Sequence, residues 1–255
     1  MTNRVGPPPL QQHASAGLPP GGRARGVGSL RTPSIIGGVC LLLLSALAGF
    51  GALVAVDGLV TPGDPATTAA DILGSEGTFR LGVASLYLVV VLDVVVAWAL
   101  FRVFSPVDVQ ISRLAAWFRL AYSGVFLVAI SQLAGIPRLL GSDEYSAAFG
   151  AEQIPAQALQ KVDAYNDIWF AGLVLFGVHL LLVGYLAYRS GYVPRILAAL
   201  LVLAGLGYVF DSFATVLSSS PLGISSVTFL GEFLLACWLV VRGRRVSVDT
   251  AVGSR

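Results

Sequence analysis

Six long apolar stretches alternate with polar segments along this chain. Each has about the length needed to cross the hydrocarbon core of a bilayer, which takes roughly 20 residues of α-helix. In lipid the backbone must satisfy its own hydrogen bonds, so runs of this length are predicted to be helices. The expected spans, which make an all-α bundle, are residues 35–56, 81–101, 114–133, 169–188, 196–217 and 224–241.

The fourth and fifth stretches flank a short basic turn, Arg189 to Arg195. The turn carries two arginines and no acid. It also carries Gly191 and Pro194, and these residue types typically end one helix and begin the next. The two stretches are therefore predicted to form a transmembrane hairpin with its tip on the more positive side of the membrane.

The distribution of charge predicts the orientation of all six spans. Twelve of the 16 basic residues lie in the two tails and in the second and fourth loops, whereas nine of the 14 acids lie in the other loops. Arginine and lysine are enriched in cytoplasmic loops. We therefore expect both termini, and the tip of the hairpin, to be cytoplasmic.

The tails and the two longer acidic loops carry further local signals. Residues 1–33 are rich in Pro and Gly and are predicted to be disordered, and residues 244–255 to be a basic tail. A cleaved signal peptide is the alternative for the start of the chain, but the first apolar run exceeds the roughly 7–15 residues of a signal core. Thr67 or Thr68 is expected to cap a short helix. A helix beginning near Ala156 is expected to continue unbroken into the fourth span.

Composition supports an integral membrane protein. Charged residues make up 12% of the chain and hydrophobic residues 56%, with a mean hydropathy of +0.80, whereas soluble domains are about 25% charged. The lipid bilayer is thus the expected partner, and a net charge of +2 argues against nucleic acid. Cys40 and Cys237 lie inside apolar runs, which favours packing over a disulfide or a metal site.

The hairpin RSGYVPRILAALLVLAGLGYVFDSF resembles the signature of a family of bacterial and archaeal membrane proteins, domain of unknown function 4386. The segments FRLGVASLYLVVVLDVVVAWALFRVFSPVD and GEFLLACWLVVRG resemble other parts of that family, so the resemblance covers about residues 34–243. It implies six membrane helices in a prokaryotic plasma membrane. It implies no activity, and it assigns no functional residues.

Ionisable residues inside the spans are the candidate functional groups, since each costs about 2.5–3.5 kcal/mol to insert. Asp93 and Arg119 are expected about 12 and 7 Å from the cytoplasmic face, at about 1.5 Å per residue. An arginine side chain covers that difference, so the two are a candidate intramembrane ion pair. The alternatives are a pair that only fixes helix packing, and an Arg119 that reaches the surface alone.

Three further ionisable residues are expected about 9 to 15 Å from the opposite face. Together with Tyr208 they define a candidate polar cavity that opens outward, lined by Asp211, Glu232 and His179. The two carboxyls are expected at nearly the same height and to share a proton. Interhelical hydrogen bonds are the plainer interpretation. Gly177 and Gly184 lie on the far side of their helix from His179, where they allow close packing on a neighbouring helix.

Three functions remain open on these grounds. The first is a carrier or binding protein that takes a small cation or amphiphile through the outward-facing cavity. The second is an intramembrane enzyme that uses Asp211, Glu232 and His179, and the third is a non-catalytic scaffold or sensor. No HExxH, GxSxG, GxGxxG, P-loop or CxxC motif occurs, which disfavours an enzyme, and we expect neither a metal nor a cofactor.

Overall fold

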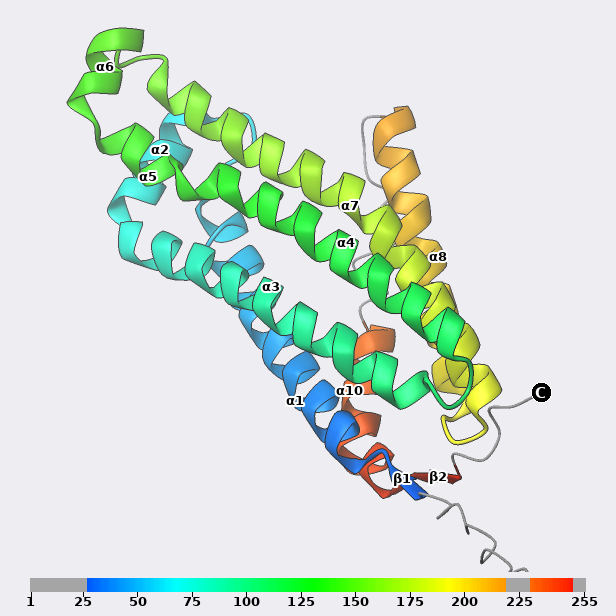
Figure 1. Cartoon of the computed structure of the whole chain (residues 1–255). Helices are drawn as coiled ribbons and strands as arrows, with labels where there is room; N and C mark the ends of the chain where they lie inside the picture. Colours follow the sequence, from blue (N-terminus) through cyan, green and yellow to red (C-terminus); the bar gives the residue numbers. More distant parts are fainter. Residues whose placement is uncertain (1–26, 219–229, 250–255) are drawn as a thin grey trace, which may run out of the picture.

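The computed structural model describes residues 27–218 and 230–249, which form an elongated bundle of helices (Figure 1). The long helices are antiparallel to their neighbours in sequence. The helices are α1 (Arg31–Ala48), α2 (Pro65–Gly74), α3 (Glu76–Phe104), α4 (Val109–Ala134), α5 (Ile136–Gly141), α6 (Asp143–Phe149), α7 (Ile154–Ser190), α8 (Arg195–Ser218) and α10 (Leu230–Val241). Single turns of π-helix (Gly49–Val54) and 3₁₀-helix (Asp57–Leu59) extend α1, and a further 3₁₀ turn (Gly243–Arg245) follows α10.

Five of these helical segments are long and apolar enough to cross a membrane. They are Arg31–Leu59, Glu76–Phe104, Val109–Gly141, Ile154–Ser190 and Arg195–Thr215. The chain therefore has the fold of a multi-pass membrane protein that is helical throughout its spans. The predicted sixth span corresponds in part to α10, which has 12 residues, while positions 224–229 lie outside the described residues. Six crossings, and the side on which the termini lie, stay predictions.

Local chemistry sets the ends of the main helices. Asp108 caps α4 by accepting hydrogen bonds from the backbone amides of Gln110 and Ile111. Helix α7 ends at Gly191, whose φ of 71° is the left-handed conformation that glycine adopts most readily. The prediction of a helix that continues unbroken into the fourth span is confirmed, because α7 runs for 37 residues without interruption.

The cap of the short helix α2 differs from the prediction. Asp64, not a threonine, caps it and accepts from the amide and hydroxyl of Thr67. These two hydrogen bonds stabilise the carboxylate and lower the pKa of Asp64. Pro65 occupies the first helical position, where its missing N–H costs nothing. Thr68 instead turns its hydroxyl back onto the Thr61 backbone.

The bundle has two different ends. At the first, the turn end, α3 meets α4 and α7 meets α8, and the Tyr192 hydroxyl donates to the Val103 carbonyl at 2.7 Å. There β1 (Val27–Ser29) pairs with β2 (Ser247–Asp249) in a small antiparallel ribbon (Figure 1). Helix α1 begins at Arg31, within the stretch predicted to be disordered, and residues 1–26 lie outside the described part. The other end, the loop end, is built by α2, α5 and α6.

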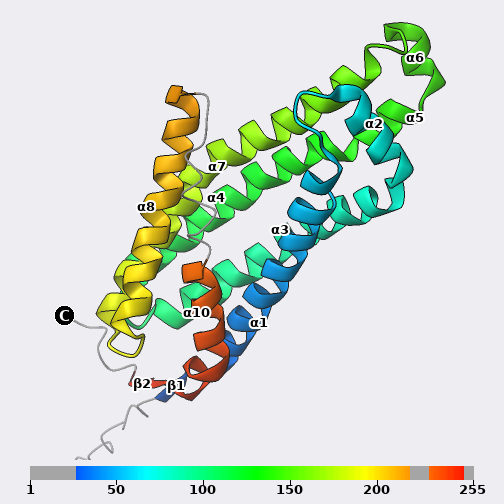
Figure 2. The ribbon, with the colours of Figure 1, turned by 180° about the vertical axis from the view of Figure 1, so that it is seen from behind.

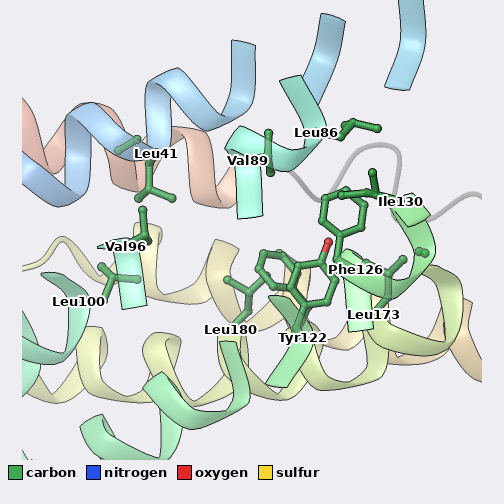
Figure 3. Packing of buried hydrophobic residues seen from close by; sticks show 14 of the residues in the cluster. Leu41, Leu86, Val89, Val96, Leu100, Tyr122, Phe126, Ile130, Leu173 and Leu180 are labelled. Atoms are coloured by element: carbon green, nitrogen blue, oxygen red, sulfur yellow. The ribbon is translucent and has the colours of Figure 1, made fainter. Parts of the chain in front are cut away.

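The helices pack as two groups that meet where α3 packs against α4. Helix α7 contacts α4 and α8, while α1 contacts α3 and α10. Seen from behind, α10 lies beside the lower part of α1 (Figure 2). Buried side chains fill the space between α3, α4 and α7, with Tyr122 and Phe126 among them (Figure 3). This packing holds the polar side chains of four helices at one level.

Candidate functional site

Four helices each contribute one ionisable residue to a cluster near the middle of the bundle. The residues are Asp93 of α3, Arg119 of α4, His179 of α7 and Glu232 of α10. Each lies about ten residues from the turn end of its helix, or about 15 Å at the helical rise. Helices that run in alternating directions thus bring four distant sequence positions together.

Arg119 is the centre of this cluster, and its side chain is fully buried. Its Nε donates to Asp93 Oδ1 at 2.9 Å, and its Nη2 lies 2.6 Å from the same oxygen. Its Nη1 donates to Glu232 Oε1 at 2.5 Å. One guanidinium therefore serves two carboxylates, and the predicted neighbours Asp93 and Arg119 are in contact.

His179 is buried, and one of its ring nitrogens faces a hydrogen-bond acceptor while the other faces a hydrogen-bond donor. Nδ1 lies 2.8 Å from the carbonyl oxygen of Ala115, which can only accept a hydrogen bond. Nε2 lies 3.2 Å from Arg119 Nη1, which can only donate. The ring therefore carries its single proton on Nδ1. It is a neutral acceptor for the arginine, which sits 5.3 Å above the ring of Phe176 as well.

The two carboxylates of the cluster differ in their surroundings. The side chain of Asp93 is 3% exposed, whereas that of Glu232 is 16% exposed. Arg119 Nη2 makes no hydrogen bond of good geometry, despite its short distance to Asp93. The guanidinium thus keeps unused donor capacity in a buried place, and Glu232 is the member nearest to solvent or lipid.

Asp211 does not join this cluster, although it is itself fully buried. The hydroxyl of the next residue, Ser212, donates to the Phe170 carbonyl of α7, nine positions before His179. The level of Asp211 is therefore about 13 Å from that of His179. On the other side of α8, Gly231 packs against Leu200. Asp211 is eleven positions further along, so Glu232 and Asp211 are not level.

The predicted grouping of Asp211 with Glu232 relied on counting residues from a span that began at 224. Helix α10 is described only from Leu230, and its contact with Leu200 sets its height. Tyr208 packs edge-on against the ring of Phe176, with 5.4 Å between the ring centroids. The sequence does contain one clue to the cluster, which is the number of buried charges of each sign. A single arginine lies deep in the spans and must be matched with the acids.

Aromatic rings fill the bundle on the loop-end side of the cluster. Phe176 contacts Tyr122 at 4.8 Å between ring centroids, and Tyr122 stacks with Phe126 at 5.8 Å. Trp169 donates its indole N–H to the Tyr122 hydroxyl at 3.1 Å and stacks on Tyr165. The Tyr165 hydroxyl is buried and has no hydrogen-bond partner. This aromatic column separates the cluster from the loop end.

A narrow void adjoins the cluster on its turn-end side. It lies between α3, α4 and α7 and is lined by His179, Ser112 and Leu186, among other residues. It has no room for a water molecule in this conformation. Among the residues that the structure describes, no group of three or more His, Cys, Asp or Glu is placed to hold a metal ion. Cys40 and Cys237 are free thiols.

Comparison with known proteins gives a family and no activity. The family described as "Domain of unknown function (DUF4386)" matches residues 36–243. An "Uncharacterized protein" of Archaeoglobus fulgidus is 33% identical over 165 residues, which is 65% of this chain and 85% of the relative. No solved structure matches significantly. The match covers all but the first turn of the helical bundle, including all four residues of the cluster, and on that basis the chain belongs to the DUF4386 family of membrane proteins.

Proposed function

We propose that this protein is a membrane carrier or binding protein that exchanges a proton or a small cation at the Arg119 cluster, with Glu232 as the exchanging group. The observation that carries the proposal is the sharing of one buried arginine by two carboxyls, Asp93 and Glu232. A purely structural pair needs one acid for one base. The second acid makes the site suited to a further positive charge.

The charge balance gives the physical reason. With Arg119 protonated, His179 neutral and both carboxyls ionised, the cluster carries one net negative charge. A net charge is costly in a low-dielectric interior, so a bound proton or cation is favoured there. Glu232 is the more exposed acid, and it is the one that a proton or ion reaches first.

The surroundings support access from the turn end. The aromatic column closes the loop-end side, whereas the void beside His179 extends the other way toward Ser112 and Leu186. A carrier of this kind would open by widening that void past His179 until it reaches Arg119 and Glu232. The expected outward-facing cavity around Tyr208 and Asp211 is therefore replaced, in this proposal, by a site that communicates with the turn end.

The other two functions gain less support. The enzyme hypothesis needs Asp211, Glu232 and His179 as a working group, yet Asp211 lies about 13 Å along the bundle from the level of His179. A scaffold requires no excess acid at a buried arginine. It would predict a cluster whose protonation never changes, which makes proton exchange the discriminating measurement.

The test is infrared difference spectroscopy of the purified protein in lipid nanodiscs during a pH change. Wild type should show a carboxyl C=O band that titrates reversibly, and Glu232→Gln should remove or shift it. Asp211→Asn is the matched control, because it changes another buried acid outside the cluster, and it should leave the titration intact. A band that is unchanged in Glu232→Gln, or lost only in Asp211→Asn, would contradict the assignment.

Transport is tested separately in proteoliposomes that enclose a pH-sensitive dye. If the cluster exchanges protons across the bilayer, an imposed pH gradient should collapse faster with wild type than with Glu232→Gln. Equal rates for wild type, Glu232→Gln and protein-free liposomes would exclude a proton carrier. A positive infrared result with no flux would identify a binding protein instead.

A further inference from the structure

A crevice at the loop end lies apart from the charge cluster. It runs between α3 on one side and the end of α4 with α5 on the other, and holds about 180 Å³. From α3 it is lined by Arg80, Val83, Ala84 and Tyr87. These positions recur at the three- and four-residue spacing of one helix face. Arg80 and Tyr87 are seven positions apart, so this face extends about 10 Å into the membrane region.

The crevice is apolar inside and charged at its mouth. Val83 and Leu133 line its walls, and Pro137 of α5 lies at its loop end. Arg80 stands at the mouth, where its Nε donates to Glu76 Oε1 at 2.6 Å. Both charged side chains are substantially exposed, by 61% and 41% respectively. The mouth therefore presents a positive and a negative group side by side above an apolar groove.

We propose that this crevice binds one membrane phospholipid with a zwitterionic, primary-amine headgroup. Arg80 donates to the phosphodiester oxygens, a geometry that guanidinium groups favour. Glu76 accepts from the ammonium group of the same lipid. The first part of one acyl chain lies along Val83 and Ala84 as far as Tyr87.

Charge complementarity selects this occupant over other amphiphiles. An anionic lipid would meet Glu76 beside Arg80, and like charges at such a distance oppose binding. A lipid with both signs matches the pair in order along α3. The volume of the crevice, about 180 Å³, also suits part of a single flexible chain and not a helix, whose diameter with side chains is about 10–12 Å. This site and the proposed exchange at Arg119 are independent.

The test measures lipid retained by the detergent-purified full chain, using native mass spectrometry. Phosphatidylethanolamine, phosphatidylcholine and phosphatidylglycerol are added separately at equal concentration. Wild type should retain phosphatidylethanolamine about tenfold more than the other two. Arg80→Gln should lower that retention about tenfold, and Glu76→Gln should abolish the preference over phosphatidylglycerol.

Two further variants separate binding from folding. Ala84→Trp fills the crevice from an exposed position and should remove the retained lipid, while Leu81→Trp, exposed on another face of α3, should not. Arg138→Gln removes an exposed arginine at the same end of the bundle, outside the crevice, and should retain lipid as wild type does. Equal retention in wild type, Arg80→Gln and Ala84→Trp would overturn the site. A preference for phosphatidylglycerol would overturn the headgroup assignment.

Discussion

Two regions of this bundle hold helices together by opposite means. At the Arg119 cluster, α3, α4 and α10 are joined through charged side chains and α7 through the neutral ring of His179. Along the contact of α7 with α8, the two backbones approach closely because no side chain separates them. A Cβ placed on Gly177 would lie 2.7 Å from the Gly205 carbonyl oxygen, and one on Gly184 would lie 3.1 Å from that of Ala198.

The difference shows which region is suited to change. The contact of α7 with α8 depends on shape, because the two backbones approach closely at two glycines. These glycines carry no ionisable group. The cluster depends on charge, because one guanidinium holds two carboxylates. In a membrane protein that alternates between two conformations, the α7–α8 pair can stay rigid while the helix contacts at the cluster change. Variants that affect the two regions differently test that division.

The largest effect is expected for Arg119→Gln. This change leaves Asp93 and Glu232 buried without their cation, and breaking a buried ion pair on one side typically costs about 3–5 kcal/mol. The free energy of unfolding in detergent should fall by that amount. Chemical or thermal unfolding followed by circular dichroism measures it.

The control for Arg119→Gln is the triple variant with Asp93→Asn and Glu232→Gln. Because it removes all three charges, it should be more stable than Arg119→Gln alone. A triple variant whose loss equals the sum of the single losses would mean that the three side chains do not interact. The Arg119 cluster would then not be what holds α3, α4 and α10 together.

The next effect is expected for Gly177→Ala in the glycine contact. The added methyl meets the Gly205 carbonyl and the Val209 side chain, both at 2.7 Å, so α7 and α8 must separate. Overpacking of this kind costs about 1–3 kcal/mol. Gly124→Ala on α4 is the matched control, since nothing lies within 4 Å of a Cβ there. It should be neutral or stabilising, because alanine is the better helix former.

The sequence predicted the glycine contact better than the cluster. The seven-residue spacing of Gly177 and Gly184 marks one face of one helix, and a face is a local property that periodicity reports directly. The five spans follow from apolar length for the same reason. Capping needed only local chemistry too, but Asp64 and Thr67 are both acceptable caps. Only the backbone shows which of them precedes the first turn.

Predicting the cluster requires the depth of each residue relative to residues on other helices, and a single sequence does not give these relative depths. Asp93 and Arg119 lie on consecutive helices joined by a short turn, so counting from that turn places them close together. Glu232 is far from any such reference, because α10 is set against α8 at Leu200. The count that paired Glu232 with Asp211 started from position 224, which lies outside the described residues, whereas the contact of Gly231 with Leu200 puts Glu232 at another level. Charge matching across the whole bundle would have corrected this.

A smaller effect is expected when one acid is removed from the cluster and Arg119 is kept. In Asp93→Asn or Glu232→Gln the arginine still has one carboxylate, so the loss should be about 1.5–3 kcal/mol, in the range of a hydrogen bond to a charged group. Glu232→Gln should cost less than Asp93→Asn, because its side chain is more exposed. Thermal unfolding of the two variants measured in parallel checks the order. The reverse order would indicate that Glu232, not Asp93, is the structural partner of the arginine.

The smallest effect is expected for an arginine–carboxylate pair that lies in water, and it isolates what burial contributes to the cluster. Glu76 and Arg80 form such a pair on the surface of α3. The distance from nitrogen to oxygen is 2.6 Å in this pair and in the pair of Arg119 with Asp93. Exposed pairs four residues apart on a helix contribute about 0.3–0.5 kcal/mol, because solvent screens them. Glu76→Gln in lipid-free detergent should therefore change the unfolding temperature by much less than Asp93→Asn, and added salt should reduce even that change. Equal losses in the two variants would show that burial does not strengthen the cluster, and the case for a membrane-embedded exchange site would lose its energetic basis.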